Sequence, residues 1–403
     1  EDPAAPFWAH SYDATTLLLD AIAAASYDDG GTLVIDRAGV REYMASVTNY
    51  SGIIGLLSCD AFGDCGSQKI TVIGHADSND IATSNANVVY EYAPGGSSQG
   101  AGELVISAET TLNSSPDDGI TDDAIKVGWI GDLTGPTASA QAFNAHGSHA
   151  YFECSNADGG LFGRQWEFFA EDDGYNAEKS AIALTKLLED EEVLALVDLG
   201  GSGQAAQAIP ELEATGVPVI GPPQTIDPTL GSGQFFHNLA AYGDQADIAV
   251  GEMAKRLGDA SNAVVLGIVL EVPSGTEYAT YVQDSVTAAG GTYVGTEYVG
   301  LRVQEATAQI LKLQSAIDQY GVNMVALHGA PYHNELVLKA MSAAGVTEIP
   351  VVGIHGVATN SIFENSPEDV TDDTYGVHSF KTSSSDIEAA AMMTRCAELA
   401  GYP

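Results

Sequence analysis

The sequence predicts an α/β protein with two lobes, each a mostly parallel β-sheet covered by helices. Two observations support this fold class. From Ala124 onward, continuous apolar strands alternate with amphipathic helices, which is the pattern of strands buried on both faces. The alternation restarts near residue 245 and runs over a second segment of similar length. Two comparable sheets in tandem predict two lobes with a cleft between them.

The first series of elements opens with the strand Ala124–Gly131 and a helix around Ser139–Ala157. The strand QWEFFAEDD, the helix AEKSAIALTKLLED and the strand Val193–Gly200 are expected next. The glycine-rich turn GGSG then leads into a helix from Gln204, and the strand Val217–Pro222 closes the series. Glycine and proline mark the turns where the strands end.

The second series repeats the same alternation of helices and strands. The expected helices are Gln245–Leu257, Tyr278–Ala289, Ala306–Tyr320 and Asn334–Ala344, and the expected strands are Ala263–Leu270, GTYVGTEYV, Val322–Gly329 and Ile349–Gly356. This series predicts a second sheet of about the same size as the first.

The residues before Ala124 break this order. Two helices are expected at Ala14–Ala25 and Asp36–Val47, followed by a β-rich stretch from Ile53 to Tyr92. The sequence APGGSSQGAG then has the composition of a flexible linker. These first residues are too few, and their pattern too incomplete, to form a good core of their own.

The charge of the chain is strongly negative, because 55 acidic and 14 basic residues give a formal net charge of −41. Nucleic acid and anionic lipid are therefore poor partners, since binding either requires clustered Lys and Arg. The scattered acids indicate a heavily hydrated surface. A calcium site at Ser115–Asp123 is the alternative, although this segment lacks the spaced ligands and closing glutamate of an EF-hand. The longest apolar run, Leu17–Ala25, is too short to span a bilayer.

The four cysteines predict at least one disulfide. Cys59 and Cys65 lie in the short loop SCDAFGDCG, which suits a small disulfide ring; a zinc site would need two more ligands, and only His75 is close. Cys154 and Cys396 lie on expected helices, where they either pair or stay as buried thiols. A disulfide indicates an oxidising compartment, so an extracytoplasmic location, in the periplasm or at the cell surface, is expected.

The GGSG turn, Gly200–Gly203, follows a strand and precedes a helix. Backbone N–H groups at such a helix N-terminus favour an anion. Ser202 either caps the helix or adds a hydroxyl donor to an anion site. Thr225 follows the next strand in the same way, and no nucleotide phosphate-loop motif is present.

Two histidines of the second series occupy positions typical of ligand sites. His328 and His355 each end a strand, and ligands bind at the carboxyl ends of strands in such sheets. Tyr242 and Asp244 lie near the expected crossover between the lobes, where they either touch a ligand or shape the hinge.

No catalytic set is evident in the sequence. His146 and His149 are three residues apart on an expected helix, but no third ligand joins them at a convincing spacing for a metal. There is no G-x-S-x-G, no H-E-x-x-H, and no cysteine beside a histidine at a strand end. We therefore expect a protein without cofactor or metal that is not an enzyme; an amide hydrolase is the enzymatic alternative.

Four segments carry a family resemblance: IKVGWIGDLTGP, NADGGLFGRQWEFFAEDD, VDLGGSGQAAQAIPELEATGVPVIGPPQTIDP and PVVGIHGVATN. Their order and spacing over residues 124–403 resemble the leucine/isoleucine/valine-binding family of ABC-importer receptors. The resemblance implies the type I periplasmic-binding fold, hinge closure on a small polar ligand, delivery to a membrane permease, and a monomer. The alternative is a ligand-sensing module of a larger receptor or regulator with the same fold.

The resemblance also implies which residues bind the ligand on the first lobe. Ser202 and Thr225, together with the adjacent main-chain groups at Gly201 and Gln224, correspond to the positions that hold the ligand carboxylate in the family.

On the second lobe the sequence departs from the family pattern. Ser274 aligns with a frequent aromatic clamp, and His355 aligns with the acid that pairs the ammonium group of an amino acid. Leucine and valine are therefore expected to bind poorly unless Glu271 or Asp244 supplies the missing charge. A small organic acid, a dicarboxylate or an amide-like solute is expected instead.

The order of the family features is also unusual. Members normally end with an aromatic-Tyr-Asp-Ala helix, a second helix and a D-x-x-G-D hairpin, but FWAHSYDATTLLLDAI and VREYMASVTNYSGIIGLLSCDAFGDCG stand at the start of this chain. We infer a circularly permuted order. The end of one repeat followed by most of the next, taken from a tandem array of repeats, would give the same sequence. The expected organisation is residues 1–93 as the C-terminal portion of the fold contributing to both lobes, 94–123 as a linker, 124–242 as lobe 1, 243–370 as lobe 2, and 371–403 as a return to lobe 1.

Overall fold

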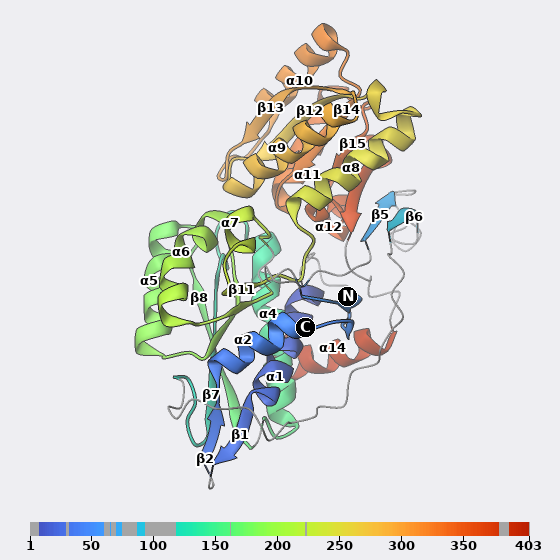
Figure 1. Cartoon of the computed structure of the whole chain (residues 1–403). Helices are drawn as coiled ribbons and strands as arrows, with labels where there is room; N and C mark the ends of the chain where they lie inside the picture. Colours follow the sequence, from blue (N-terminus) through green and yellow to red (C-terminus); the bar gives the residue numbers. More distant parts are fainter. Residues whose placement is uncertain are drawn as a thin grey trace. The chain divides into compact units, whose positions relative to one another are not determined.

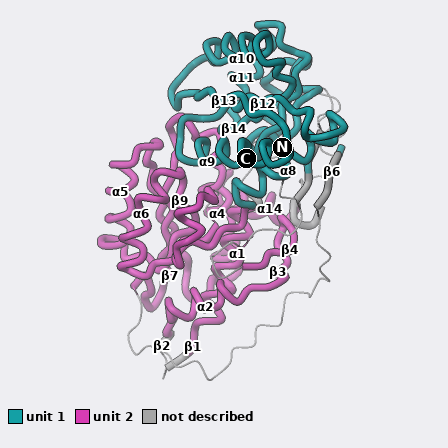
Figure 2. Tube along the Cα trace, turned by 45° about the horizontal axis from the view of Figure 1, so that its top comes forward, with its two compact units in different colours: residues 1–6, 69–93, 240–379 teal, residues 7–68, 94–239, 380–403 magenta. Residues whose placement is uncertain are grey.

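The computed structural model describes residues 8–29, 32–59, 65, 70–74, 87–92, 118–161, 163–221, 224–378 and 387–402. The chain forms two compact units, each built around its own sheet (Figure 1 and Figure 2). Among the described residues, unit 1 comprises 70–74, 87–92 and 240–378, and unit 2 comprises the remainder. The predicted α/β class, with two mostly parallel sheets, is confirmed.

Unit 2 is built on a five-stranded parallel sheet in the order β11-β10-β9-β7-β8. Its strands are β7 (Ala124–Gly131), β8 (Gln165–Asp172), β9 (Ala195–Leu199), β10 (Val219–Ile220) and β11 (Phe235–Phe236). Every residue of β9 is buried, because parallel strands at the centre of a sheet carry helices on both faces.

The helices and small strands of unit 2 come from three separate parts of the chain. The helices are α1 (Trp8–Ala24), α2 (Arg37–Ser46), α4 (Ala138–Ala157), α5 (Ala177–Thr185), η1 (Lys186–Asp190), α6 (Ser202–Thr215), α7 (Asp227–Leu230) and α14 (Ile387–Leu399). Strand β1 (Ser26–Asp29) pairs antiparallel with β2 (Thr32–Ile35), and strand β3 (Tyr50–Ser51) pairs antiparallel with β4 (Leu56–Leu57). Leu18 and Ile22 of α1 share one buried cluster with Ile125 and Val197 of the sheet. The segment that carries α1 and α2 is therefore part of the core of unit 2.

Arg37, the first residue of α2, ties that segment to the sheet. Its guanidinium is buried and donates to the carbonyl oxygens of Val193, Leu194 and Thr215 at 3.3–3.4 Å. Asp36 caps the helix by accepting from the Ala38 N–H. Charged groups are rarely buried without such partners.

Unit 1 is built on a seven-stranded sheet in the order β13-β12-β14-β15-β16-β5-β6. The first five are parallel, and β5 and β6 join antiparallel at one edge. The strands are β12 (Val264–Leu270), β13 (Thr292–Val299), β14 (Met324–His328), β15 (Val351–Gly353), β16 (Thr374–His378), β5 (Ile70–Gly74) and β6 (Val88–Tyr92). The helices are α8 (Tyr242–Leu257), η2 (Ala260–Asn262), α9 (Pro273–Ala288), α10 (Thr307–Tyr320), α11 (Pro331–Ala343), η3 (His355–Val357), α12 (Asn360–Asn365) and α13 (Glu368–Thr371).

Several helices begin earlier than expected. The helices expected from Ala14, Gln204 and Gln245 begin at Trp8, Ser202 and Tyr242. Those expected from Tyr278 and Asn334 begin at Pro273 and Pro331, because a proline is well tolerated in the first turn. The expected return to the first lobe at residue 371 is wrong for residues 374–378, since β16 pairs within the sheet of unit 1. Residues 94–117, most of the expected linker, lie outside the described residues.

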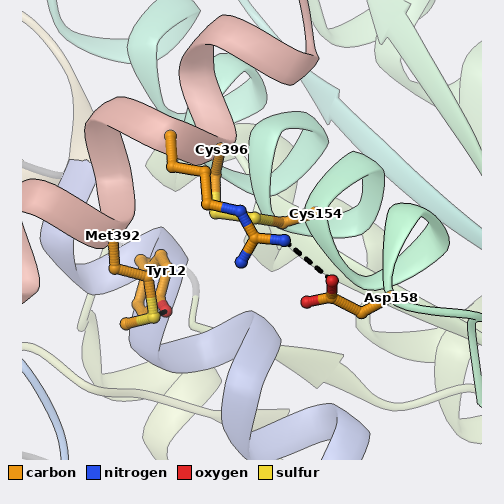
Figure 3. The surroundings of a disulfide bond; sticks show 6 residues. Tyr12, Cys154, Asp158, Met392 and Cys396 are labelled. Atoms are coloured by element: carbon orange, nitrogen blue, oxygen red, sulfur yellow. Dashed lines mark hydrogen bonds and ion pairs between the residues drawn. A yellow bond between two sulfur atoms is a disulfide. The ribbon is translucent and has the colours of Figure 1, made fainter.

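Both cysteine pairs form disulfides within unit 2. Cys59 joins Cys65, and Cys154 of α4 joins Cys396 of α14. Figure 3 shows Met392 near this second disulfide, where its sulfur accepts a hydrogen bond from the Tyr12 hydroxyl at 3.2 Å. Since residues four apart lie on one face of a helix, Met392 and Cys396 both attach the same face of α14 to the unit.

We expect the two disulfides to contribute unequally to stability. The Cys154–Cys396 bond spans 242 positions and the Cys59–Cys65 bond spans six, so the first restricts the unfolded chain far more. On the chain-entropy relation, replacing both cysteines by serine should cost about 5 kcal/mol for the long-range pair and about 2 kcal/mol for the short one. Guanidinium unfolding of the two double variants measures the difference; an equal loss would contradict this account.

Candidate functional site

The carboxyl edge of the sheet in unit 2 gathers buried polar residues. β9 ends at Leu199, the chain turns through Gly200 and Gly201, and α6 begins at Ser202. Gly201 has φ +91°, and a Cβ there would collide with the Gln204 side chain. The turn therefore requires glycine, and it places the N-terminus of a 14-residue helix at the sheet edge.

Ser202 has no exposed surface and lies against a residue that the sequence did not single out. Burial raises the pKa of the Tyr175 phenol to about 12, while the hydroxyl and the backbone group of Ser202 hydrogen-bond to it and act in the opposite direction. Tyr175 has φ +55°, and its N–H donates to Asp173 Oδ1 at 2.7 Å. The sequence could have indicated Tyr175, because it lies two residues after the expected strand that ends in EDD at Asp173.

Thr225 lies at the same edge, because it follows β10, and β10 pairs in parallel with β9. It is fully buried, as Ser202 is. Gln224 is 9% exposed, and its Oε1 atom has no hydrogen-bond partner within the described part of the chain. The four residues expected on the first lobe, Gly201, Ser202, Gln224 and Thr225, are thus all at the carboxyl edge of one sheet.

Three buried aspartates lie close to this edge. Asp132 follows β7 and accepts hydrogen bonds from the N–H and the hydroxyl of Thr137 at 2.7 and 2.8 Å. Burial raises the pKa of Asp173, which follows β8, to about 6. Burial raises the pKa of Asp198 to about 7, although Asn144 donates to its Oδ2 atom at 2.9 Å. Burial therefore favours the protonated form of Asp173 and Asp198.

The carboxyl edge of the sheet in unit 1 collects the residues expected on the second lobe. His328 ends β14, His355 follows β15, and Ser274 lies in the first turn of α9, which follows β12. Tyr242 begins α8, and its ring centroid lies 5.5 Å from that of His328 and 6.4 Å from that of His355. The structure brings Tyr242 and the two histidines together, and these three residues and Ser274 are all buried.

The hydrogen bonds of Gln245 fix the protonation of the His355 ring. The Gln245 Nε2 atom donates to the Ala240 carbonyl at 2.8 Å, so its Oε1 atom faces His355 Nδ1 at 3.0 Å. Because an amide oxygen only accepts, His355 Nδ1 carries a proton and donates it to Gln245.

Tyr278 of α9 is the second aromatic residue that sequence reasoning missed. It has no exposed surface, and its ring centroid lies 5.7 Å from that of His328. Burial lowers the pKa of His328 to about 3, so this imidazole is neutral. The sequence gave no signal for Tyr278, because tyrosines that only pack in the core of a helical protein follow the same helical spacing.

The remaining candidate residues have other roles or no evident one. The ring of His149 contacts the Tyr402 hydroxyl at 2.9 Å, and the His146 ring packs on Tyr402. Glu271 and Asp244 are exposed.

Within the described ranges, no three His, Cys, Asp or Glu side chains are grouped to hold a metal ion. In the same residues, no helix combines the length and the apolar character needed to cross a membrane. Residues 115–117 of the calcium candidate and His75 lie outside the described residues.

Comparison with known proteins agrees with this architecture. A sequence model of the periplasmic binding protein family matches residues 124–402. A search of curated proteins gave no match.

Among solved structures, the chain resembles a fatty acid ABC transporter substrate-binding protein from Thermomonospora curvata, with TM-score 0.53, 20% identity, and 61% of this chain and 62% of the other covered. A branched-chain amino acid ABC transporter from Thermus thermophilus with bound valine gives TM-score 0.51, 19% identity, and 59% and 62% coverage. An ABC transporter solute-binding protein from R. palustris in complex with 4-hydroxybenzoate gives TM-score 0.52, 17% identity, and 68% and 74% coverage. The similarity spans less than two thirds of the first two proteins.

The raised pKa of Asp198 predicts a pH-dependent loss of stability. In the unfolded chain this carboxyl titrates near pH 4, whereas in the folded chain it titrates near pH 7, so the folded state retains a proton that the unfolded state has released. Stability should therefore fall as the pH rises from about 4 to 7. Asp198→Asn should remove this dependence and stabilise the protein at pH 8 by roughly 2–4 kcal/mol, as measured by denaturant unfolding across that range.

Asp172→Asn is the matched control. Burial opposes ionisation of Asp172, but hydrogen bonds from Thr134, Leu133 and Gly174 lower its pKa. The Asp172 carboxylate therefore contributes stability above the pKa that it has in the unfolded chain, and this contribution is lost as the pH falls. Asp172→Asn should consequently be less stable than wild type at neutral pH. Stability profiles of wild type and Asp198→Asn that run parallel would contradict a buried, protonated Asp198.

Proposed function

The chain belongs to the periplasmic binding protein family, and from this premise we propose that it is an extracytoplasmic solute-binding receptor of an ABC importer. It binds one small polar solute, closes by hinge motion between its two units, and delivers the solute to a membrane permease. The main support is the collection of buried polar side chains at the carboxyl edge of each parallel sheet. Such edges are where open α/β sheets bind ligands.

The carboxylate of the solute binds to unit 2. The N-terminus of α6 presents backbone N–H groups, with the hydroxyls of Ser202 and Thr225 at the same edge. This arrangement suits an anion without any basic side chain. Fatty acids, valine and 4-hydroxybenzoate, the ligands named for the three similar structures, each carry a carboxylate, which supports this assignment.

The solute lacks an ammonium group close to this carboxylate. At the carboxyl edge of unit 1, His355 stands where an acid would be needed, and its Nδ1 proton is already donated to Gln245. The acidic residues of unit 1 that are buried in the described structure, Glu252 and Glu335, pair with Arg256 and Lys339. An ammonium ion buried at this edge of unit 1 would therefore meet no unpaired buried acid of that unit, which is strongly unfavourable.

Calorimetry and thermal shift test this function. Wild type should bind an organic acid, and an acid at 100 times its Kd should add about 2.7 kcal/mol of stability. Leucine should bind more weakly by about ten- to a hundredfold, because a charge-assisted bond is missing. Ser202→Ala should weaken binding of the acid by about tenfold, whereas Ser46→Ala, on the exposed surface of α2, should leave it unchanged. Sub-micromolar binding of leucine that survives His355→Ala would refute this view of the site.

We further propose that the chain order is circularly permuted relative to the family. The family match begins at residue 124, yet α1 and α2 pack in unit 2 and β5 and β6 extend the sheet of unit 1. Residues 8–92 thus supply elements to both units, as the C-terminal portion of the fold would.

A rearranged chain tests the permutation. The sequence 118–403 joined directly to 1–92 should fold with a melting temperature within a few degrees of wild type and bind the same acid, because every described element is retained. A second rearrangement that opens the chain inside α4, at residue 148, should fail to fold because it interrupts a buried helix. If neither rearranged chain folds, the permuted order is wrong.

A further inference from the structure

Several buried polar atoms of unit 1 have no hydrogen-bond partner in the described chain, and three of them lie in two adjacent rings. These three are the hydroxyl oxygen of Tyr278 and the two ring nitrogens of His328. Tyr278 has no exposed surface and His328 is 5% exposed. A buried polar group left unpaired costs about 1–3 kcal/mol, so three such atoms in two adjacent rings call for a specific role.

The backbone holds the two rings together at the carboxyl edge of the sheet. His328 is the last residue of β14, and Tyr278 lies on α9, with ring centroids 5.7 Å apart. Gly275 allows this packing, because a Cβ at that position would collide with the Leu270 carbonyl oxygen and stand 3.2 Å from His328 Nδ1. Ser274, in the same first turn of α9, is the neighbouring candidate binding residue.

The surroundings of the pair are electrically neutral. Burial lowers the pKa of His328 to about 3 and raises that of Tyr278 above its usual value, so both side chains are uncharged near neutral pH. No Lys or Arg of unit 1 is buried in the described structure, and its two buried glutamates are already paired. The pair therefore lacks a counter-charge for either an ammonium group or a second carboxylate.

We propose that Tyr278 and His328 recognise a neutral hydroxyl or amide group of the solute, which makes the solute a hydroxy acid or an amide-bearing acid. This rests on the proposed function, in which unit 2 binds the carboxylate. A neutral imidazole offers one donor and one acceptor, and a phenol both donates and accepts. Hydroxyl and amide groups also donate and accept, so one such group can pair with both side chains. The N-terminus of α9 further favours an oxygen atom at this edge.

Binding requires a side chain to move. The three atoms are buried, so a solute reaches them only after neighbouring side chains shift. Tyr242 is one such neighbour, since its ring centroid lies 5.5 Å from that of His328.

Calorimetry with matched acids tests the proposal. The pairs are 4-hydroxybenzoate with benzoate, 4-hydroxybutyrate with butyrate, and glutaramate with pentanoate. Wild type should bind the polar member of at least one pair about tenfold or more tightly than its partner. Tyr278→Phe should reduce that preference to less than about threefold, by weakening only the polar member. Because it removes an unpaired buried hydroxyl, the unliganded variant should melt at the same or a higher temperature than wild type. His328→Leu should lose the preference as well.

Tyr293→Phe is the matched control in the same unit. The Tyr293 hydroxyl is already bonded to Thr296 at 2.8 Å, so this variant should lower the melting temperature and keep the preference. Equal binding of both members of every pair by wild type, or an unchanged preference in Tyr278→Phe, would overturn the proposal while leaving the receptor function intact. If wild type binds none of the six acids but binds leucine, the assignment of a solute without an ammonium group is wrong and the proposal is wrong with it.

Discussion

The constraint on which this structure depends is the parallel direction of its central strands. Parallel strands all end at the same edge of the sheet, so the residues that follow them are brought together whatever their distance in sequence. In unit 2 this places Ser202 beside the strand that leads to Thr225. In unit 1 it collects Ser274, His328 and His355 from three neighbouring strands. The two edges thus become polar although central strands such as β9 and β12 are mostly apolar and buried.

This constraint explains how much of the site could be predicted from the sequence. The apolar strands and the Gly200–Gly201 turn are local signals, so the residues directly after strands were found correctly at the sheet edges. Tyr175 and Tyr278 were missed because their importance depends on partners far away in the chain, Ser202 and His328. Aromatic residues in a loop or on a helix look alike in sequence whether they pack in a core or contact a site.

The pairing of β5 and β6 with β16 shows the same limit at the level of the fold. Nothing in the sequence near Ile70 or Val88 specifies a partner strand about 300 positions away. Such pairing is decided by which sheet edge is left open after the local elements have packed. For this reason the β-rich character of Ile53–Tyr92 was predictable, but its partner β16, which was expected to lie outside the second lobe, was not.

The net charge of −41 bears on how such a protein binds an acid. The surface charge repels an approaching carboxylate, but in physiological salt this repulsion is screened beyond about 8 Å. In the proposed mode of binding, the solute meets no buried basic side chain at the edge of unit 2, and the donors assigned to it there are backbone N–H groups and hydroxyls. These donors act at hydrogen-bond distance and depend on exact placement, so affinity depends on the rigidity of the Gly200–Ser202 turn rather than on overall charge. A strongly acidic surface and selectivity for an organic acid are therefore compatible in one molecule.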